Sequence, residues 1–365
     1  MNAPNAAPNA APNAAPKASP KASPNASPGS SHAAVRKVFA KARLPVMGAP
    51  MFLVSGPELV SASLKAGIVG TYAAPNARNI AALDAALAQI AAEAAHYPQV
   101  PWALNMIVHS SYDRFDAEMA LVERYRPGIV TTALGSPRRV LERVHGYGGL
   151  VMADVISPAL ARKAIDAGVD GLVLVTSGAG GHTGTYHPFA FLAEVRRFWD
   201  GPIGLAGAIS SGAEIRAAQL LGADFAVVGT RLIATRESMA APAYRDMLVA
   251  SSMEDLVQST AVSGVMANWL KPTVAAAGFT PDKLKEEKKI DFSGDIASAP
   301  KAWRDVWSAG HGVGAIDAVG SVEDVVTALA DSYAACLAGE AEQVLQLLPR
   351  YRRGSATAAE RLAAA

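Results

Sequence analysis

The segment AGVDGLVLVTS, residues 167–177, gives the clearest indication of the fold, and LGADFAVVGT, residues 221–230, has the same pattern. In both, a glycine follows a helix-like segment, an aspartate comes two residues later, and an apolar run begins directly after the aspartate. Glycine commonly ends helices because it adopts the left-handed conformation without steric penalty. The apolar runs are continuous, as in parallel strands that are covered on both faces. The pattern therefore predicts helices that alternate with parallel strands.

Eight strand-like runs follow one another from residue 44 onward, with helix-like segments between them. Several helices are expected to open at capping residues, namely Asp113, Ser136 and Ser157, the two serines with proline directly after them. Eight such units in about 200 residues favour a (β/α)₈ TIM barrel over the alternative, a doubly wound open sheet. The predicted strands are 46–49, 68–72, 102–108, 129–133, 150–156, 171–177, 203–206 and 225–229.

Composition divides the chain into four parts. Residues 1–34 are almost only Ala, Pro, Asn and Ser, which predicts a disordered tail because repeated prolines block helix and sheet. Residues 35–240 hold the predicted barrel. Residues 241–320, with a Lys/Glu run at 283–289, are expected to form an excursion at the barrel mouth. Residues 321–365 are expected to be a C-terminal helix and tail.

Charge and cysteine content exclude several classes of function. The 365 residues carry 33 basic and 32 acidic side chains, which gives no electrostatic reason to expect a nucleic-acid partner. No apolar run approaches the roughly 18 residues of a membrane span. The single cysteine, Cys336, rules out an intrachain disulfide and suits a reducing cytosol. A cytoplasmic protein without nucleic-acid or membrane partners is predicted.

The carboxyl ends of the predicted strands offer few reactive side chains, although chemistry is located there in this fold. No lysine falls at a strand end, which argues against a Schiff-base aldolase. One carboxylate does, Asp154, which is too few for a divalent metal site. A bound cofactor that supplies the chemistry is therefore expected, and no metal.

Glycines indicate the kind of cofactor. Gly207 closes one strand and Gly229-Thr230 closes the next, at the positions where a barrel binds phosphate through backbone N–H groups and a helix N-terminus. The loop GAGGHTG, residues 178–184, contains four glycines that let a flexible backbone lie against a flat ligand. It also contains His182, which can exchange a proton near neutral pH.

These residues resemble the nitronate monooxygenase family, formerly called 2-nitropropane dioxygenases, over roughly residues 44–320. The loop AGGHTG at 179–184 is the most specific piece, and its order relative to the two phosphate loops adds to its weight. The other matching pieces are GAPM at 48–51, Asn105, GAI at 207–209, GT at 229–230, SG at 263–264 and AGHG at 309–312.

The resemblance implies an FMN-dependent barrel that oxidises alkyl nitronates with O₂ to a carbonyl compound and nitrite, with no metal and no obligatory nicotinamide. His182 would be the catalytic base, or would orient the nitronate. The residues implied to contact the flavin ring are Ala49, Met51, Asn105, Gly180 and Gly181, and those implied to hold the phosphate are Gly207, Ala208, Gly229 and Thr230.

The sequence departs from the family pattern in places that leave alternatives open. Ala208 replaces the usual second glycine of its loop, and His311 stands where glutamine is common. An FMN- and NAD(P)H-dependent enoyl reductase and a non-catalytic flavin-binding scaffold are the alternatives. The roles of His109 and His311 stay open, and Asp154 either orients a group in the mouth or bonds a backbone amide. His187 could help bind substrate, but a surface role at the helix cap is favoured because Pro188 follows and begins a helix.

Overall fold

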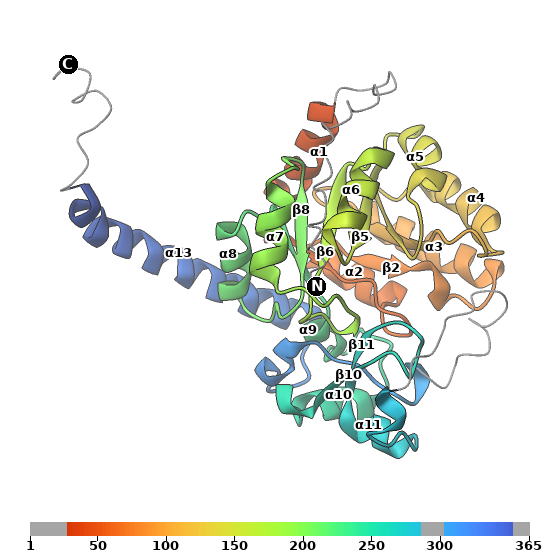
Figure 1. The fold of residues 1–365 in the computed structure, drawn as a ribbon. Helices are drawn as coiled ribbons and strands as arrows, with labels where there is room; N and C mark the ends of the chain where they lie inside the picture. The colour runs from red at the N-terminus through yellow and green to blue at the C-terminus, as the bar shows by residue number, and fades with distance from the viewer. Residues whose placement is uncertain (1–27, 286–302, 353–365) are drawn as a thin grey trace, which may run out of the picture.

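The computed structural model describes residues 28–285 and 303–352. Eight parallel strands form a barrel with helices around it, which confirms the predicted TIM barrel (Figure 1). A backbone hydrogen bond of 2.8 Å from Gly48 to Val69 brings the first and second strands together and closes the ring. The strands are β1 Val46–Gly48, β2 Thr71–Ala73, β3 Ala103–Ile107, β4 Ile129–Ala133, β5 Leu150–Val155, β6 Gly171–Val175, β8 Ile203–Ala206 and β9 Phe225–Val228.

The helices of the barrel lie where the sequence places them, although one predicted cap is wrong. The Ser157 side chain accepts a hydrogen bond from the Leu160 N–H and caps its helix as predicted. The Ser136 hydroxyl accepts the Arg138 N–H at 3.4 Å, as expected of a cap. Among the described residues, no side-chain hydrogen bond from Asp113 caps α4, which begins at Phe115. The helices are α2 Pro57–Lys65, α3 Ile80–Ala94, α4 Phe115–Tyr125, α5 Arg138–His145, α6 Pro158–Ala167, α7 Pro188–Arg196 and α8 Gly212–Leu220.

The amino-terminal end of the barrel is covered by a helix whose first residues were expected to belong to the tail. This helix, α1, spans Pro28–Lys41, so residues 28–34 are helical and the predicted boundary at residue 34 is wrong. Val35 and Phe39 are buried, and the Phe39 ring stacks on Phe225 at a centroid distance of 3.9 Å. Apolar burial on the barrel stabilises this helix despite the neighbouring prolines. Residues 1–27 lie outside the described residues.

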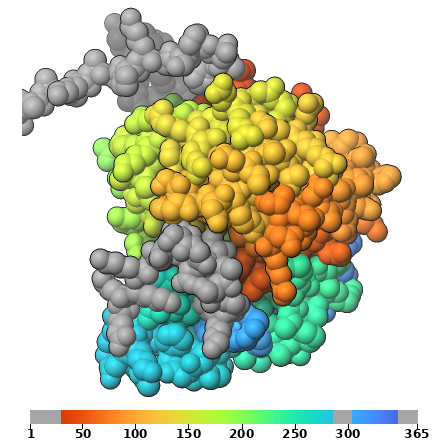
Figure 2. Space-filling view, turned by 90° about the vertical axis from the view of Figure 1, so that its right-hand side faces the viewer, coloured from red at the N-terminus to blue at the C-terminus, as the bar shows by residue number. Residues whose placement is uncertain are grey.

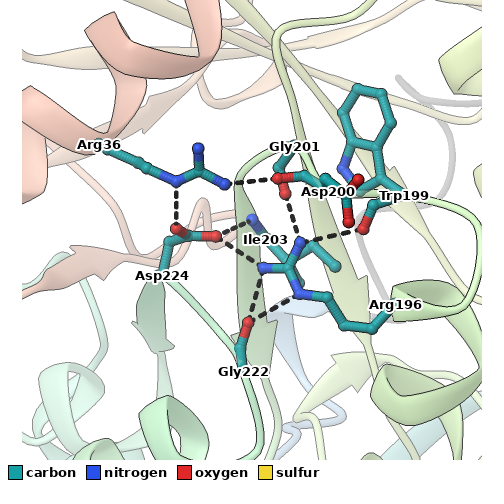
Figure 3. A network of polar contacts seen from close by, with 8 residues as sticks. All are labelled: Arg36, Arg196, Trp199, Asp200, Gly201, Ile203, Gly222 and Asp224. Carbon is teal, nitrogen blue, oxygen red and sulfur yellow. Dashed lines mark hydrogen bonds and ion pairs between the residues drawn. The ribbon is translucent and has the colours of Figure 1, made fainter. Parts of the chain in front are cut away.

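A polar network anchors α1 to the amino-terminal end of the barrel (Figure 3). The Asp224 carboxylate, at the start of β9, accepts hydrogen bonds from Arg36 Nε at 2.8 Å and Arg196 Nη2 at 2.7 Å. It also accepts the Ile203 N–H at 2.8 Å, at the start of the neighbouring strand. One carboxylate thus joins α1, α7 and two strands, and it leaves the opposite end of the barrel free for chemistry.

The excursion after β9 forms a lobe at the carboxyl ends of the strands (Figure 2). Val54, from the loop after β1, is buried against Tyr244 and Leu270 of this lobe. Two of its strands join β7, Gly181–His182, in a small antiparallel sheet that the sequence pattern does not predict. Its elements are α9 Thr230–Ile233, α10 Pro242–Val249, β10 Leu256–Ser259, β11 Ala267–Leu270, α11 Lys271–Ala276 and the 3₁₀ turns Met253–Asp255, Lys283–Lys285 and His311–Ala315.

The predicted C-terminal helix is α13, Val322–Arg352, which packs on α2 and α8 and then extends away from the barrel (Figure 1). Arg216 of α8 holds it by a two-pronged contact with Glu340, at 2.7 and 2.9 Å. Within the two described ranges, no helix combines the length and apolar character needed to cross a membrane.

We expect Phe39→Ala to lower the free energy of unfolding by about 3–5 kcal/mol, because it removes a fully buried ring and leaves a cavity under β9. Lys37→Ala, on the exposed side of the same helix, should change it by no more than about 0.5 kcal/mol. Urea unfolding of both variants measures the difference. Equal midpoints would mean that α1 is not packed against the barrel.

Candidate active site

Three loops from distant parts of the chain meet at backbone distance at the barrel mouth. A Cβ atom on Gly180 would lie 2.7 Å from the Gly310 backbone nitrogen, and one on Gly310 would lie 2.6 Å from the Gly178 carbonyl oxygen. The Gly310 N–H donates to the Thr230 hydroxyl at 2.8 Å. Only glycine permits such approaches, so the loop after β6, the start of α9 and the segment at 309–310 form one unit, named here the glycine cluster.

Four backbone N–H groups beside the glycine cluster have no hydrogen-bond partner among the described residues. They belong to Ile209 and Ser210, after β8, and to Thr230 and Arg231, at the start of α9. The first N–H groups of a helix lack partners inside the helix and attract anions. Together they form a set of donors suited to a phosphate group.

The start of α8 does not contribute to this set, although the sequence pattern suggests it as part of the phosphate site. The Glu214 side chain accepts the Ser211 N–H, and the Ser211 hydroxyl accepts the Ala213 N–H, in a capping box. The Gly212 N–H donates to Ser332 of α13 at 3.1 Å. This helix N-terminus is therefore satisfied by its own side chains and by α13.

Residues with strained backbone angles are concentrated in the loops at the barrel mouth. Among the described residues, four other than glycine have positive φ, and three of them lie in loops that follow barrel strands: Leu53, Leu134 and Ala208. Ala208 has φ +56°, next to Gly207 with φ +126°. A left-handed conformation costs such a residue roughly 1–2 kcal/mol, and strain of this kind tends to occur at functional sites.

The loop after β1 carries Ala49 and Met51 to the glycine after β9. A Cβ atom on Gly229 would lie 3.4 Å from Ala49 Cβ and 3.7 Å from Met51 Sδ. Asn76, from the loop after β2, holds this loop in place by accepting the Leu53 N–H at 2.7 Å and donating to the Met51 and Ser55 carbonyls. The predicted ring-contacting residues Ala49 and Met51 therefore lie beside the predicted phosphate residue Gly229.

The loop that carries His182 is tied down, whereas its four glycines predict a flexible loop. In β7, His182 pairs with Ala267 and Gly181 with Asn268 of β11. The Asn268 side-chain amide also donates to the carbonyls of Ser177 at 3.0 Å and Ala179 at 2.7 Å. The excursion thus fixes the histidine, and the sequence contains no motif that would have identified Asn268.

The His182 side chain is open to solvent on one side and contacts protein on the other. Its side chain is exposed, and its ring meets the edge of Trp303 at a centroid distance of 5.2 Å. Desolvation by the surrounding protein lowers the pKa of the imidazole below its ordinary value of 6.5. At pH 7 the ring is therefore neutral and able to accept a proton from a molecule in the mouth.

Asn105, on β3, forms a polar group with Thr131 and Asp154 from the next two strands. Its amide nitrogen donates to Thr131 Oγ1 at 2.8 Å and to Asp154 Oδ2 at 3.2 Å. Asp154 has no cation partner among the described residues, and burial raises its pKa to about 7, although the Asn105 hydrogen bond acts in the opposite direction. Of the two roles left open for Asp154, the structure supports contact with a side chain in the mouth.

The remaining histidines differ in position. The His187 ring accepts the Phe189 N–H at 3.2 Å and caps α7, as predicted. His109 pairs with the Ser111 hydroxyl at 2.7 Å in the loop after β3. His311 is exposed, and its backbone N–H donates to the Gly178 carbonyl at 3.0 Å, so the late segment supports the glycine cluster through its backbone.

The closed barrel, with the glycine cluster and His182 together, defines a (β/α)₈-barrel protein whose candidate site lies at the carboxyl ends of the strands. A family model described as "Nitronate monooxygenase" matches residues 34–331. The chain belongs to the nitronate monooxygenase family and is a flavin-dependent oxidoreductase, which confirms the resemblance seen in the sequence.

Individual proteins agree with this assignment. The chain is 28% identical over 281 residues to the nitronate monooxygenase of Paraburkholderia phytofirmans, a match that covers 65% of this chain and 76% of that protein. It shares its fold with a nitroalkane oxidase from Streptomyces ansochromogenes, at a TM-score of 0.70 and 22% identity over 83% of this chain and 99% of the other. It also shares its fold with the enoyl reductase domain of MlnA from Bacillus amyloliquefaciens, at a TM-score of 0.65 and 12% identity over 85% and 98% of the two chains.

We expect Ala208→Gly to raise the free energy of unfolding by roughly 0.5–1 kcal/mol. Glycine removes the strain of the left-handed conformation, and the larger conformational entropy of glycine in the unfolded chain offsets part of this gain. Ala217→Gly, on the exposed face of α8, is the matched control and should lower it by a similar amount. Urea unfolding measures both changes. Destabilisation of the same size in the two variants would mean that residue 208 is not left-handed in solution.

Proposed function

We propose that this protein binds FMN at the barrel mouth and oxidises alkyl nitronates with O₂ to a carbonyl compound and nitrite. One observation carries the proposal: four unpaired backbone N–H groups, counted among the described residues, lie on the two loops where barrels bind phosphate, in a chain of this family. The names of the Paraburkholderia relative and of the Streptomyces nitroalkane oxidase support the same class of substrate.

The residues present suit a flavin with one phosphate. Ile209, Ser210, Thr230 and Arg231 offer N–H donors for the phosphate, next to Gly207, Ala208 and Gly229. Ala49, Met51 and Asn105 would lie along the ring, and Gly180 and Gly181 would pass over it without side chains in the way. When bound, FMN would accept the electron pair of the substrate and pass electrons to O₂.

The protein's own contribution to the reaction is then mainly proton transfer and orientation. The neutral imidazole of His182 would take the proton from the carbon that bears the nitro group, or hold a nitronate that has already lost this proton. Its lowered pKa keeps it in the accepting form at neutral pH. The pairing of β7 with β11 holds the backbone of His182 in one position, and the Trp303 ring contacts its imidazole.

A second candidate is reduction of an enoyl thioester by NAD(P)H through the same FMN. The shared fold with an enoyl reductase domain favours it, although identity at this level speaks for the fold alone. In both cases the partners would be small molecules, and we propose the cytoplasm as the location.

We expect the purified protein to carry FMN, which heat denaturation should release as a flavin with one phosphate. Gly310→Ala should lose most of it, because the added Cβ would lie 2.6 Å from the Gly178 carbonyl and push the glycine cluster apart. Gly314→Ala is the control, since its nearest neighbour would lie at 3.9 Å. FAD in the extract, or no flavin after reconstitution of the wild type, would contradict the proposal.

We expect His182→Asn to keep FMN and to lower kcat/KM on neutral nitroalkanes by about 10²–10⁴-fold, the usual contribution of a general base. Preformed nitronate should lose less, because its proton is already gone. His187→Asn is the matched control, since asparagine also caps helices and activity should stay unchanged. Oxygen uptake with both substrate forms provides the rates.

Wild-type rates of His182→Asn on both substrate forms would reject a role for this histidine. Equal and severe losses on both forms would show that His182 orients the nitronate instead of acting chiefly as a base.

A further inference from the structure

The Asn105 amide is held in one orientation by its neighbours. Its side chain is 7% exposed, and both N–H bonds are used, one to Thr131 Oγ1 at 2.8 Å and one to Asp154 Oδ2 at 3.2 Å. A flipped amide would place its carbonyl oxygen against the Asp154 carboxylate, where two acceptors repel each other. The orientation therefore depends on Asp154.

The strand register brings the three side chains to one face. Asn105 of β3 is opposite Thr131 of β4, and Thr131 is opposite Met152 of β5. Asp154 comes two residues after Met152 and so projects from the same face of its strand. Asn105 and Thr131 are the middle residues of β3 and β4, and Asp154 is the last residue but one of β5.

This arrangement leaves the carbonyl oxygen of Asn105 without a partner. Within residues 28–285 and 303–352, no hydrogen bond is made to Oδ1, although the side chain is more than nine-tenths buried. Oδ1 is not among the fully buried unpaired polar atoms of the described residues, so it remains accessible to a ligand that supplies a donor.

A half-buried carboxylate with no cation nearby is unfavourable, and its pKa of about 7 reflects that cost. Its polar neighbours from the adjacent strands are neutral: Thr131 and Asn105. If residue 154 only packed between its neighbours, an uncharged side chain would give a more stable fold. Unfavourable carboxylates of this kind occur preferentially at functional sites.

We propose that Asp154 is a positioning residue that holds Asn105 as a hydrogen-bond acceptor for a ring N–H of the bound flavin. The inference rests on the proposed function, because it requires flavin at the mouth. It assigns Asp154 a role through Asn105, without direct contact with the substrate.

The test is a titration of apoprotein with FMN at pH 8.5, where the Asp154 carboxylate is ionised. The change in flavin fluorescence gives the Kd. Asp154→Leu has a similar shape but cannot accept the amide N–H, and its Kd should rise roughly tenfold. Asp154→Asn still offers an acceptor and should stay within about threefold of the wild type. If the leucine variant does not fold, Asp154→Ser, which is too short to reach the amide, takes its place.

A double-mutant cycle separates positioning from a general structural role. In an Asn105→Ala background, Asp154→Leu should change the Kd less than about twofold, because the residue it acts through is gone. An unchanged Kd in the single variant, or an equal loss in both backgrounds, would overturn the inference. Wild-type apoprotein that binds no FMN at all would overturn the proposed function as well, so the two failures are distinguishable.

Discussion

The site depends on backbone segments that approach each other more closely than side chains allow. Gly178, Gly180 and Gly310 bring the loop after β6 into contact with the late segment of the chain, and the Thr230 hydroxyl bridges them. A Cβ atom at Gly180 or Gly310 would collide with backbone, which cannot move aside as a flexible side chain can. The positions of the histidine, of the free N–H groups and of the excursion all follow from this contact.

The excursion has a function in this architecture that its irregular sequence conceals. Its strand β11 pairs with β7, and Asn268 holds two carbonyls of the same loop. The Trp303 ring lies against His182 and also packs on Trp269, at a centroid distance of 4.5 Å. A segment more than 80 residues away in the sequence thus fixes a loop that four glycines would otherwise leave mobile.

Local patterns sufficed to predict the barrel, because continuous apolar runs and glycine helix ends are local signals. All eight strands lie within a few residues of their predicted positions, and Ser157 and His187 cap the helices they were expected to cap. Tertiary contacts determine what was missed. The start of α1 is stabilised by burial of Phe39 on Phe225, and the pairing of β7 with β11 joins residues that no periodicity connects. The hydrogen bonds of Asn105 to Thr131 and Asp154 depend on strand register, which also cannot be read from one segment at a time.

Nitronate oxidation by this protein requires that a nitronate delivers its electrons to a flavin held at the mouth. Anaerobic mixing of the flavin-loaded protein with ethylnitronate, and separately with NADPH, tests this transfer. We expect the absorbance of the oxidised flavin to disappear with ethylnitronate, and to do so much faster than with NADPH. Loss of absorbance with NADPH alone would identify an NADPH-dependent reductase, and no loss with either would identify a flavin-binding scaffold. Both results would contradict nitronate oxidation.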